Sequence, residues 1–309
     1  MSKILFHRQY DRYSGGQQKV LDYFEHCLRH PQLAPYISWG QTSVAVETTP
    51  WQEYESRIQH TFTPDDHDLV FLAGMDWQDY LPVKTREQTV INLIQHVRHA
   101  DPNANVHPYL QEPAIRICVS EEVKQAIDST GLVNGKTFAI PNGIDTTDLE
   151  QFDQQKIPNS VYILGLKQPE LAEQLKEKLT DRHHVICHTE HVERAEVLSA
   201  MAATEISVLL PHATEGFFLP ALESMRLSQL TVVPDCVGNR SFCDAGVNCL
   251  MPKLELSDLL DSVSEAFQLI QQGEAKMFSE NARKTLEKHS IERERQAFYA
   301  LVESSSILN

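Results

Sequence analysis

A chain of 309 residues is longer than one ordinary α/β core and suits two domains of about 150 residues each. Its 41% hydrophobic and 23% charged residues are typical of a globular protein and exclude a disordered one. The formal net charge of −16 argues against a nucleic-acid binder and a broad polybasic membrane face, but is compatible with peripheral membrane contact through a local patch.

The first half of the sequence alternates short apolar runs with amphipathic segments, which predicts a parallel, doubly wound sheet. A glycine pair, Gly15 and Gly16, opens the first predicted helix. The polar turn at 141–145 marks a domain boundary, so we expect an N-terminal Rossmann-like domain at residues 1–143. Its expected strands are 3–6, 34–46, 68–73, 89–94, 114–119 and 137–140, and its expected helices are 15–28 and 121–129.

The alternation restarts after this boundary and predicts a second Rossmann-like domain at residues 144–290. The tail from 257 to 308 has the apolar spacing of helices. Between the boundary and the tail, the expected strands are 160–164, 184–187, 206–210 and 230–234, and the expected helices are 169–179, 195–202 and 219–227.

Cysteines, histidines and apolar runs limit the remaining classes of protein. The six cysteines contain no Cys-x-x-Cys pair, and buried thiols are the expected interpretation. His183, His184, His188 and His191 cluster, but no thiolate or carboxylate pattern completes a familiar zinc site, so we predict no metal. The apolar runs are far shorter than a bilayer-spanning helix and the N-terminus begins a strand, so we expect a cytoplasmic protein.

Two glutamates with seven residues between them are the most informative motif in the chain. A predicted strand ends just before Glu215, and the helix after it contains Glu223. The first N–H groups at such a junction have no intrahelical partner, so the amides of Gly216, Phe217 and Phe218 can donate to a diphosphate. A carboxylate instead pairs with hydroxyls, one on a sugar and one on a ribose. The competing interpretation is a helix-capping carboxylate and a solvated helix residue.

Three stretches resemble retaining glycosyltransferases of the GT-B architecture, specifically family 4. Residues 140–145 look like the linker signature of that family, 215–223 match its E-x7-E motif, and 231–238 with 246–252 resemble its terminal strand and loop. The likeness extends over nearly the whole chain. It implies two Rossmann-like domains facing a central cleft, and a C-terminal helix at 291–309 that returns to the N-terminal domain.

The resemblance also implies how the donor is held. Lys167 would stabilise the leaving diphosphate together with helix-end amides, and Glu215 would position the donor without acting as nucleophile. The family usually supplies both an Arg and a Lys near this point, whereas the sequence has a lone lysine, for which a solvated side chain is the alternative. The implied donor-binding residues are Glu215, Gly216, Phe217, Phe218, Glu223, Lys167, Gly15 and Gly16.

The expected acceptor residues follow two predicted strands of the first half. Many relatives carry a histidine after the fourth strand, whereas this chain has Asp76 near that point, which we expect to accept a hydrogen bond from the acceptor hydroxyl. A turn-starting aspartate is the alternative. Arg98 and His99 follow the next strand and are expected to bind a phosphate and a hydroxyl of the acceptor, with a solvated helix start as the alternative.

The resemblance therefore implies transfer of a hexosyl group, with retention and without a metal or other cofactor. The donor would be a UDP- or GDP-linked sugar, and the acceptor a hydroxyl of a glycan, a lipid-linked molecule or another compound, as in polysaccharide biosynthesis. Two alternatives stay open. One is a sugar-nucleotide epimerase of the same fold, with acid–base partners from the histidine-rich segment 183–191. The other is a catalytically silent subunit of a partner transferase, which the missing histidine and the lone Lys167 allow.

Overall fold

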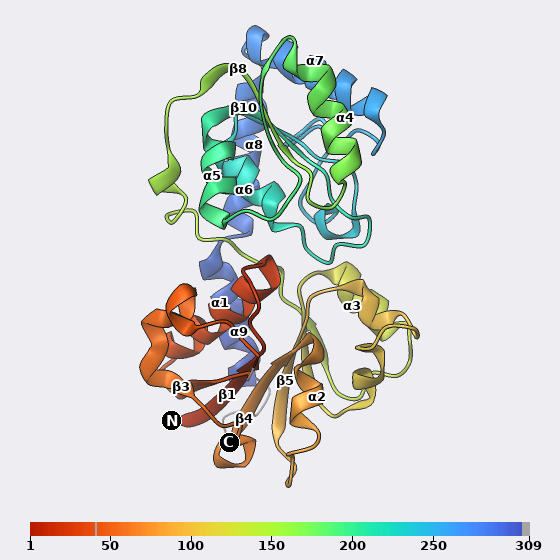
Figure 1. Cartoon of the computed structure of the whole chain (residues 1–309). Helices are drawn as coiled ribbons and strands as arrows, with labels where there is room; N and C mark the ends of the chain where they lie inside the picture. The colour runs from red at the N-terminus through yellow and green to blue at the C-terminus, as the bar shows by residue number, and fades with distance from the viewer. Residues whose placement is uncertain (41, 305–309) are drawn as a thin grey trace. The chain divides into compact units, whose positions relative to one another are not determined.

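The computed structural model describes residues 1–40 and 42–304, which form two compact units (Figure 1). Unit 1 comprises Met1–Asn142 and the chain from Glu294 onward, and unit 2 comprises Gly143–Arg293. Each unit is built on its own parallel sheet with helices packed against it. Within the described ranges, no helix combines the length and the apolar character needed to cross a membrane.

Unit 1 contains a parallel sheet with the strand order β3-β2-β1-β4-β5-β6-β7. Its apolar runs are buried along their whole length, as in β4, because helices cover both faces of such a sheet. The strands are β1 (Ser2–Arg8), β2 (Leu33–Trp39), β3 (Ile58–Gln59), β4 (Leu69–Ala73), β5 (Thr89–Ile94), β6 (Ile115–Cys118) and β7 (Thr137–Ala139). The α-helices are α1 (Gly15–Arg29), α2 (Trp77–Tyr80), α3 (Glu121–Asp128) and α9 (Ile291–Ser304). The 3₁₀ helices are Val46–Thr48, Pro50–Arg57, Pro64–Asp66, Gly74–Asp76, Val97–Ala100 and His107–Gln111.

Unit 2 contains a parallel sheet with the strand order β11-β10-β8-β9. Alternate residues of β10 enter two apolar clusters: Leu209 packs with helices α5, α6 and α8, and Val208 packs with α4 and α7. The strands are β8 (Ile157–Leu164), β9 (His184–His188), β10 (Thr204–Leu209) and β11 (Leu230–Val232). The helices are α4 (Pro169–Thr180), α5 (Arg194–Ala203), α6 (Leu219–Leu227), α7 (Leu256–Gln272) and α8 (Ala275–Lys288), with 3₁₀ turns at Glu150–Phe152 and Val237–Asn239.

Several expected boundaries are wrong. The expected strand at 34–46 ends at Trp39, because Gly40 donates its N–H to the Arg8 carbonyl and a turn follows; residue 41 lies outside the described residues. The strand β8 begins at Ile157, three residues early, since the polar residues before Val161 still pair with the sheet. The helical tail is divided at Gly273, whose φ of 77° ends α7, and its expected last residues, 305–309, lie outside the described part.

Candidate functional site

The carboxyl ends of the unit 2 strands bring several predicted site residues to one edge. Lys167 follows β8, and Glu215 lies in the loop after β10, the strand that pairs with β8. The α4, α5 and α6 helices begin at this edge (Figure 1). Loops at the carboxyl edge of an open parallel sheet are where ligands bind.

Glu215 and Lys167 form a loose ion pair. The Lys167 Nζ lies 3.8 Å from the Glu215 Oε1, and the two side chains are 57% and 20% exposed. Such an exposed pair contributes little to stability. Both groups are therefore open to solvent and to a ligand.

Glu223 is held much more firmly, by an arginine that sequence reasoning missed. The Arg194 Nε and a terminal guanidinium nitrogen donate to the Glu223 Oε1 at 3.2 and 2.8 Å. The side chains of Glu223 and Arg194 are 10% and 31% exposed. Arg194 is the first residue of α5, on the loop after β9, and its only sequence signal is that place at a strand-to-helix junction.

The loop that carries Glu215 is braced by the loop after β11. The Phe218 N–H donates to the Gly238 carbonyl at 3.0 Å. A Cβ at Gly238 would lie 2.8 Å from the Phe217 nitrogen and 2.9 Å from the Glu215 carbonyl oxygen. The expectation that the Phe218 amide faces a diphosphate is therefore wrong for this arrangement, because that amide is already used. The buried Gly216 and half-buried Phe217 lie between the Glu215 side chain and this contact.

In unit 1, Arg8 links three elements at the carboxyl edge of the sheet. Its Nε donates to the Gln17 side chain at 2.9 Å, and one terminal nitrogen reaches both Asp76 oxygens at 3.1 and 3.0 Å. The Ala73 N–H also donates to Asp76 at 2.8 Å. Burial raises the pKa of Asp76, and the Arg8 charge offsets part of that rise. The Asp76 carboxylate thus has a structural task, holding the ends of β1 and β4 to α1.

The glycine pair forms the first turn of α1. Ser14 is the N-cap, and its side chain accepts the Gln17 N–H at 3.2 Å. The Gln95 side chain, at the end of β5, donates to the Gly16 carbonyl at 3.1 Å, and a Cβ on Gly16 would lie 3.2 Å from the same amide group. Gln95 thus fixes the position of the turn containing Gly15 and Gly16.

No family model matches the sequence, and no curated protein matches it by sequence. Solved structures do match the fold. Sucrose-phosphate synthase from Thermosynechococcus elongatus aligns with a TM-score of 0.72 and 11% identity over 100% of both chains. Anabaena HepE, in complex with UDP-glucose, gives a TM-score of 0.73 and 13% identity over 98% of this chain and 100% of HepE. The lipopolysaccharide outer core galactosyltransferase WaaB gives 0.68 and 11% over 99% and 100%. The chain has the GT-B fold.

The GT-B edge of unit 1 treats the two expected acceptor residues differently. Arg98 is exposed, whereas the His99 side chain is buried and the residue is only 4% exposed. Burial lowers the pKa of His99 to about 3, so its ring is neutral at neutral pH. Arg98 thus has the access that an acceptor contact needs, and His99 has little surface to offer.

The histidine-rich segment of the GT-B chain does not gather into one group. His183 precedes β9 and stacks on Phe267, with ring centroids 4.4 Å apart. His188 ends β9, where it contacts the Tyr162 hydroxyl at 3.1 Å and Glu196 at 3.3 Å. The five-residue strand separates the two rings, which weakens the acid–base argument for an epimerase. Among the described residues, no three His, Cys, Asp or Glu side chains are grouped so that they could hold a metal ion.

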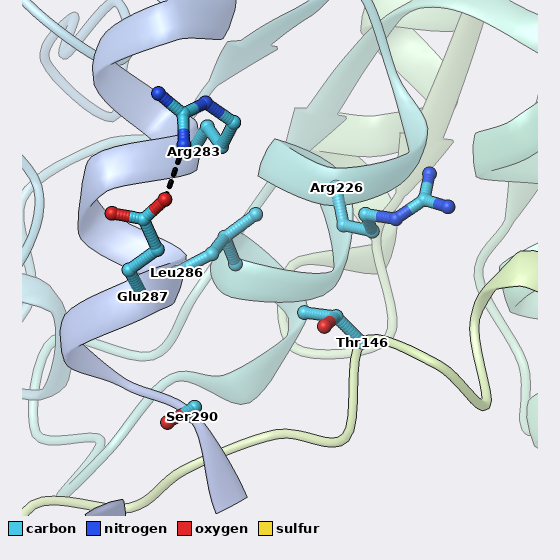
Figure 2. Close-up of a pocket in the computed structure, with 6 residues that line it drawn as sticks. All are labelled: Thr146, Arg226, Arg283, Leu286, Glu287 and Ser290. Atoms are coloured by element: carbon cyan, nitrogen blue, oxygen red, sulfur yellow. Dashed lines mark hydrogen bonds and ion pairs between the residues drawn. The ribbon is translucent and has the colours of Figure 1, made fainter.

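A hollow of about 360 Å³ lies elsewhere in unit 2 and contains none of the predicted site residues (Figure 2). Both of its arginines have carboxylate partners. Arg283 pairs with Glu287 within α8, and Arg226 donates to both oxygens of Asp153 at 2.9 and 2.8 Å. In Figure 2 the Arg226 guanidinium points away from Arg283. Paired guanidiniums that point apart do not form an anion site, so this hollow carries no functional assignment.

Proposed function

We propose that this chain is a retaining, metal-independent glycosyltransferase that moves a hexosyl group from a nucleoside diphosphate sugar to a hydroxyl. The observation that supports it best is the pairing of each E-x7-E glutamate with its own cation. Glu215 lies beside Lys167, and Glu223 beside Arg194, at the ligand-binding edge of unit 2. The fold supports the same proposal, because solved structures that share it include a galactosyltransferase and a protein bound to UDP-glucose.

The donor lies along this edge in our proposal. Glu215 accepts a hydrogen bond from a sugar hydroxyl and Glu223 accepts one from the ribose. Lys167 and the Phe217 amide face the diphosphate, since Lys167 is mostly exposed and the described residues offer the Phe217 N–H no acceptor. We favour UDP over GDP as the nucleotide because HepE binds UDP and UDP-glucose.

The reaction needs help chiefly at the leaving group. The bond between the anomeric carbon and the diphosphate oxygen breaks, and a bond from that carbon to the acceptor oxygen forms on the same face. The acceptor proton passes to the departing diphosphate. Lys167 and the loop amide lower the barrier by stabilising the negative charge that develops there. Arg98, exposed on unit 1, is the residue we favour for holding an acceptor phosphate.

Titration calorimetry with UDP, GDP and TDP and their glucose conjugates tests the proposal. We expect one nucleotide to bind, and Glu223→Gln to weaken it about tenfold, the value of one charge-assisted hydrogen bond. The matched control is Glu177→Gln, an exposed glutamate of α4, which should change nothing. NMR of the product should show the donor's anomeric configuration, and activity should survive chelation with EDTA.

Three outcomes would contradict parts of this proposal. Absence of binding by every nucleotide would reject the donor site. Binding without transfer to any acceptor of a glycan and lipid-linked panel would favour a silent partner subunit. Conversion of the bound sugar nucleotide to its epimer would replace the transferase with an epimerase.

A further inference from the structure

The two oxygens of the Glu223 carboxylate differ in their surroundings. Oε1 accepts two N–H groups from Arg194, at 3.2 and 2.8 Å, which occupies both of its lone pairs. Oε2 has no hydrogen-bond partner anywhere in ranges 1–40 and 42–304. The side chain is 10% exposed, so Oε2 has limited but real access to a ligand.

The packing of α5 against α6 explains why Arg194 reaches Glu223. Leu198 of α5 and Leu222 of α6 belong to the same buried apolar cluster, which fixes the two helices relative to each other. Arg194 opens α5 on the same side, and Glu223 follows Leu222. A carboxylate that is nine-tenths buried is costly without a charged partner, and a planar guanidinium holds it in one orientation.

We propose that Arg194 is a positioning residue, which fixes the Glu223 carboxylate through Oε1 and leaves Oε2 as the acceptor for a ribose hydroxyl. This inference rests on the proposed function, since it names the nucleotide sugar's ribose as the ligand. It makes Arg194 act through Glu223 and not on the diphosphate. Both described Arg194 donor atoms point at Oε1, whereas Lys167 is the cation beside the loop that we assign to the diphosphate.

A matrix of ligands and variants separates these two tasks for Arg194. The ligands are UDP, 2′,3′-dideoxy-UDP and uridine, which lack neither group, the hydroxyls and the diphosphate, respectively; the guanosine series replaces them if the protein prefers GDP. The variants are Arg194→Gln, Arg194→Lys and Glu223→Gln. The matched control is Arg182→Gln, which removes an exposed guanidinium of the same unit. Thermal unfolding checks that each variant is folded.

The wild-type protein should bind UDP about tenfold more tightly than the dideoxy analogue, as one charge-assisted hydrogen bond requires. In Arg194→Gln and Glu223→Gln this ratio should fall to about one to two, because the acceptor oxygen is no longer held or charged. Uridine should weaken by the same factor as UDP. Arg194→Lys should restore part of the ratio, and Arg182→Gln should keep all of it.

Two results would overturn the inference. A wild-type ratio retained in Arg194→Gln would show that Arg194 does not position Glu223. A loss of UDP affinity in Arg194→Gln with uridine binding unchanged would assign Arg194 to the diphosphate. Both results leave the proposed function intact, because the wild-type protein still binds nucleotide. Failure of the wild-type protein to bind any of the nucleotides would reject the proposed function and this inference together.

Discussion

Gly238 determines where the Glu215 loop lies, because its α-carbon approaches that loop too closely for any side chain. We expect Gly238→Ala to push the Phe217 amide and the Glu215 carbonyl away, since an added Cβ would lie 2.8 and 2.9 Å from them. Nucleotide affinity should fall at least about tenfold and stability by about 1–3 kcal/mol. Calorimetry and urea unfolding measure the two effects.

The control for Gly238 is Gly273→Ala, at the end of α7. Gly273 has a φ of 77° and open space around its α-carbon, so the substitution adds backbone strain without a clash. It should lower stability by about 1 kcal/mol and leave nucleotide affinity unchanged. Equal losses of affinity in both variants would mean that the effect of Gly238 is only a loss of stability.

Arg116 is a buried cation whose described partners are all carbonyl groups. It is 0% exposed, and burial lowers its pKa to about 10. Its guanidinium donates to five backbone carbonyls, those of Tyr109, Leu110, Glu112, Ala114 and Asn134. Arg116→Met would leave these carbonyls unsatisfied, so we expect the free energy of unfolding to fall by at least about 3 kcal/mol. Urea unfolding against Arg29→Met, an exposed arginine, checks this, and similar small losses in both would refute it.

At the scale of elements, apolar runs predicted most strands because both faces of a parallel sheet are covered, as in β4 and β5. The two-residue strand β3 and the short helix α2 were missed, since neither contains a full period of a pattern. The E-x7-E motif marked the site because strand, loop and helix are consecutive there.

The partners of the site residues could not be predicted in the same way. Arg8 meets Asp76 across 68 positions, and Arg194 meets Glu223 across 29. Strand order and helix packing create these contacts, and no local periodicity encodes them. The same holds for Gly238, whose neighbour in space is the Glu215 loop.

The helix α9 is fastened to α1 by buried charges. Glu294 accepts from Lys19 at 2.6 Å and contacts His26 at 3.0 Å, and Lys19 also reaches Asp22 at 2.6 Å. The Tyr23 and Phe298 rings pack beside them with centroids 5.2 Å apart. Burial would raise the pKa of Glu294, but Lys19 and His26 outweigh it and the pKa lies below 4.5. Burial likewise would lower the pKa of Lys19, but Asp22 and Glu294 raise it above 10.5.

The signs of these shifts predict a pH window for α9 docking. Stability from Glu294 is fully present above about pH 4.5 and is lost as the pH falls through its lower folded-state pKa. Stability from Lys19 is lost only above pH 10.5. We expect hydrogen exchange in α9 to accelerate below pH 4.5. The double variant Lys19→Met/Glu294→Met should lose this dependence and stay folded, since an apolar pair can replace a buried ion pair. Equal acid sensitivity in both proteins would refute the mechanism.

For the whole molecule, the two chain crossings between the units lie beside each other. The Ile144 N–H donates to the His289 carbonyl at 2.9 Å, and the Ile291 N–H donates to the Ile144 carbonyl at 3.0 Å. A Cβ on Gly143 would lie 2.4 Å from the Ser290 oxygen, so only glycine permits this approach. The bonded pair of crossings ties the end of one unit to the beginning of the other, while each unit keeps its own sheet and core.

Separate cores predict that nucleotide stabilises one unit selectively. All three tryptophans, Trp39, Trp51 and Trp77, lie in unit 1, so tryptophan fluorescence reports its unfolding, whereas far-UV circular dichroism reports both units. With UDP at about 100 times its dissociation constant, unit 2 should gain about 2.7 kcal/mol. The dichroism transition should therefore move to higher urea while the fluorescence transition stays in place, and Glu223→Gln at the same UDP concentration should reduce the movement. A fluorescence transition that moves equally would mean that the two units unfold as one cooperative body or that nucleotide binding also stabilises unit 1.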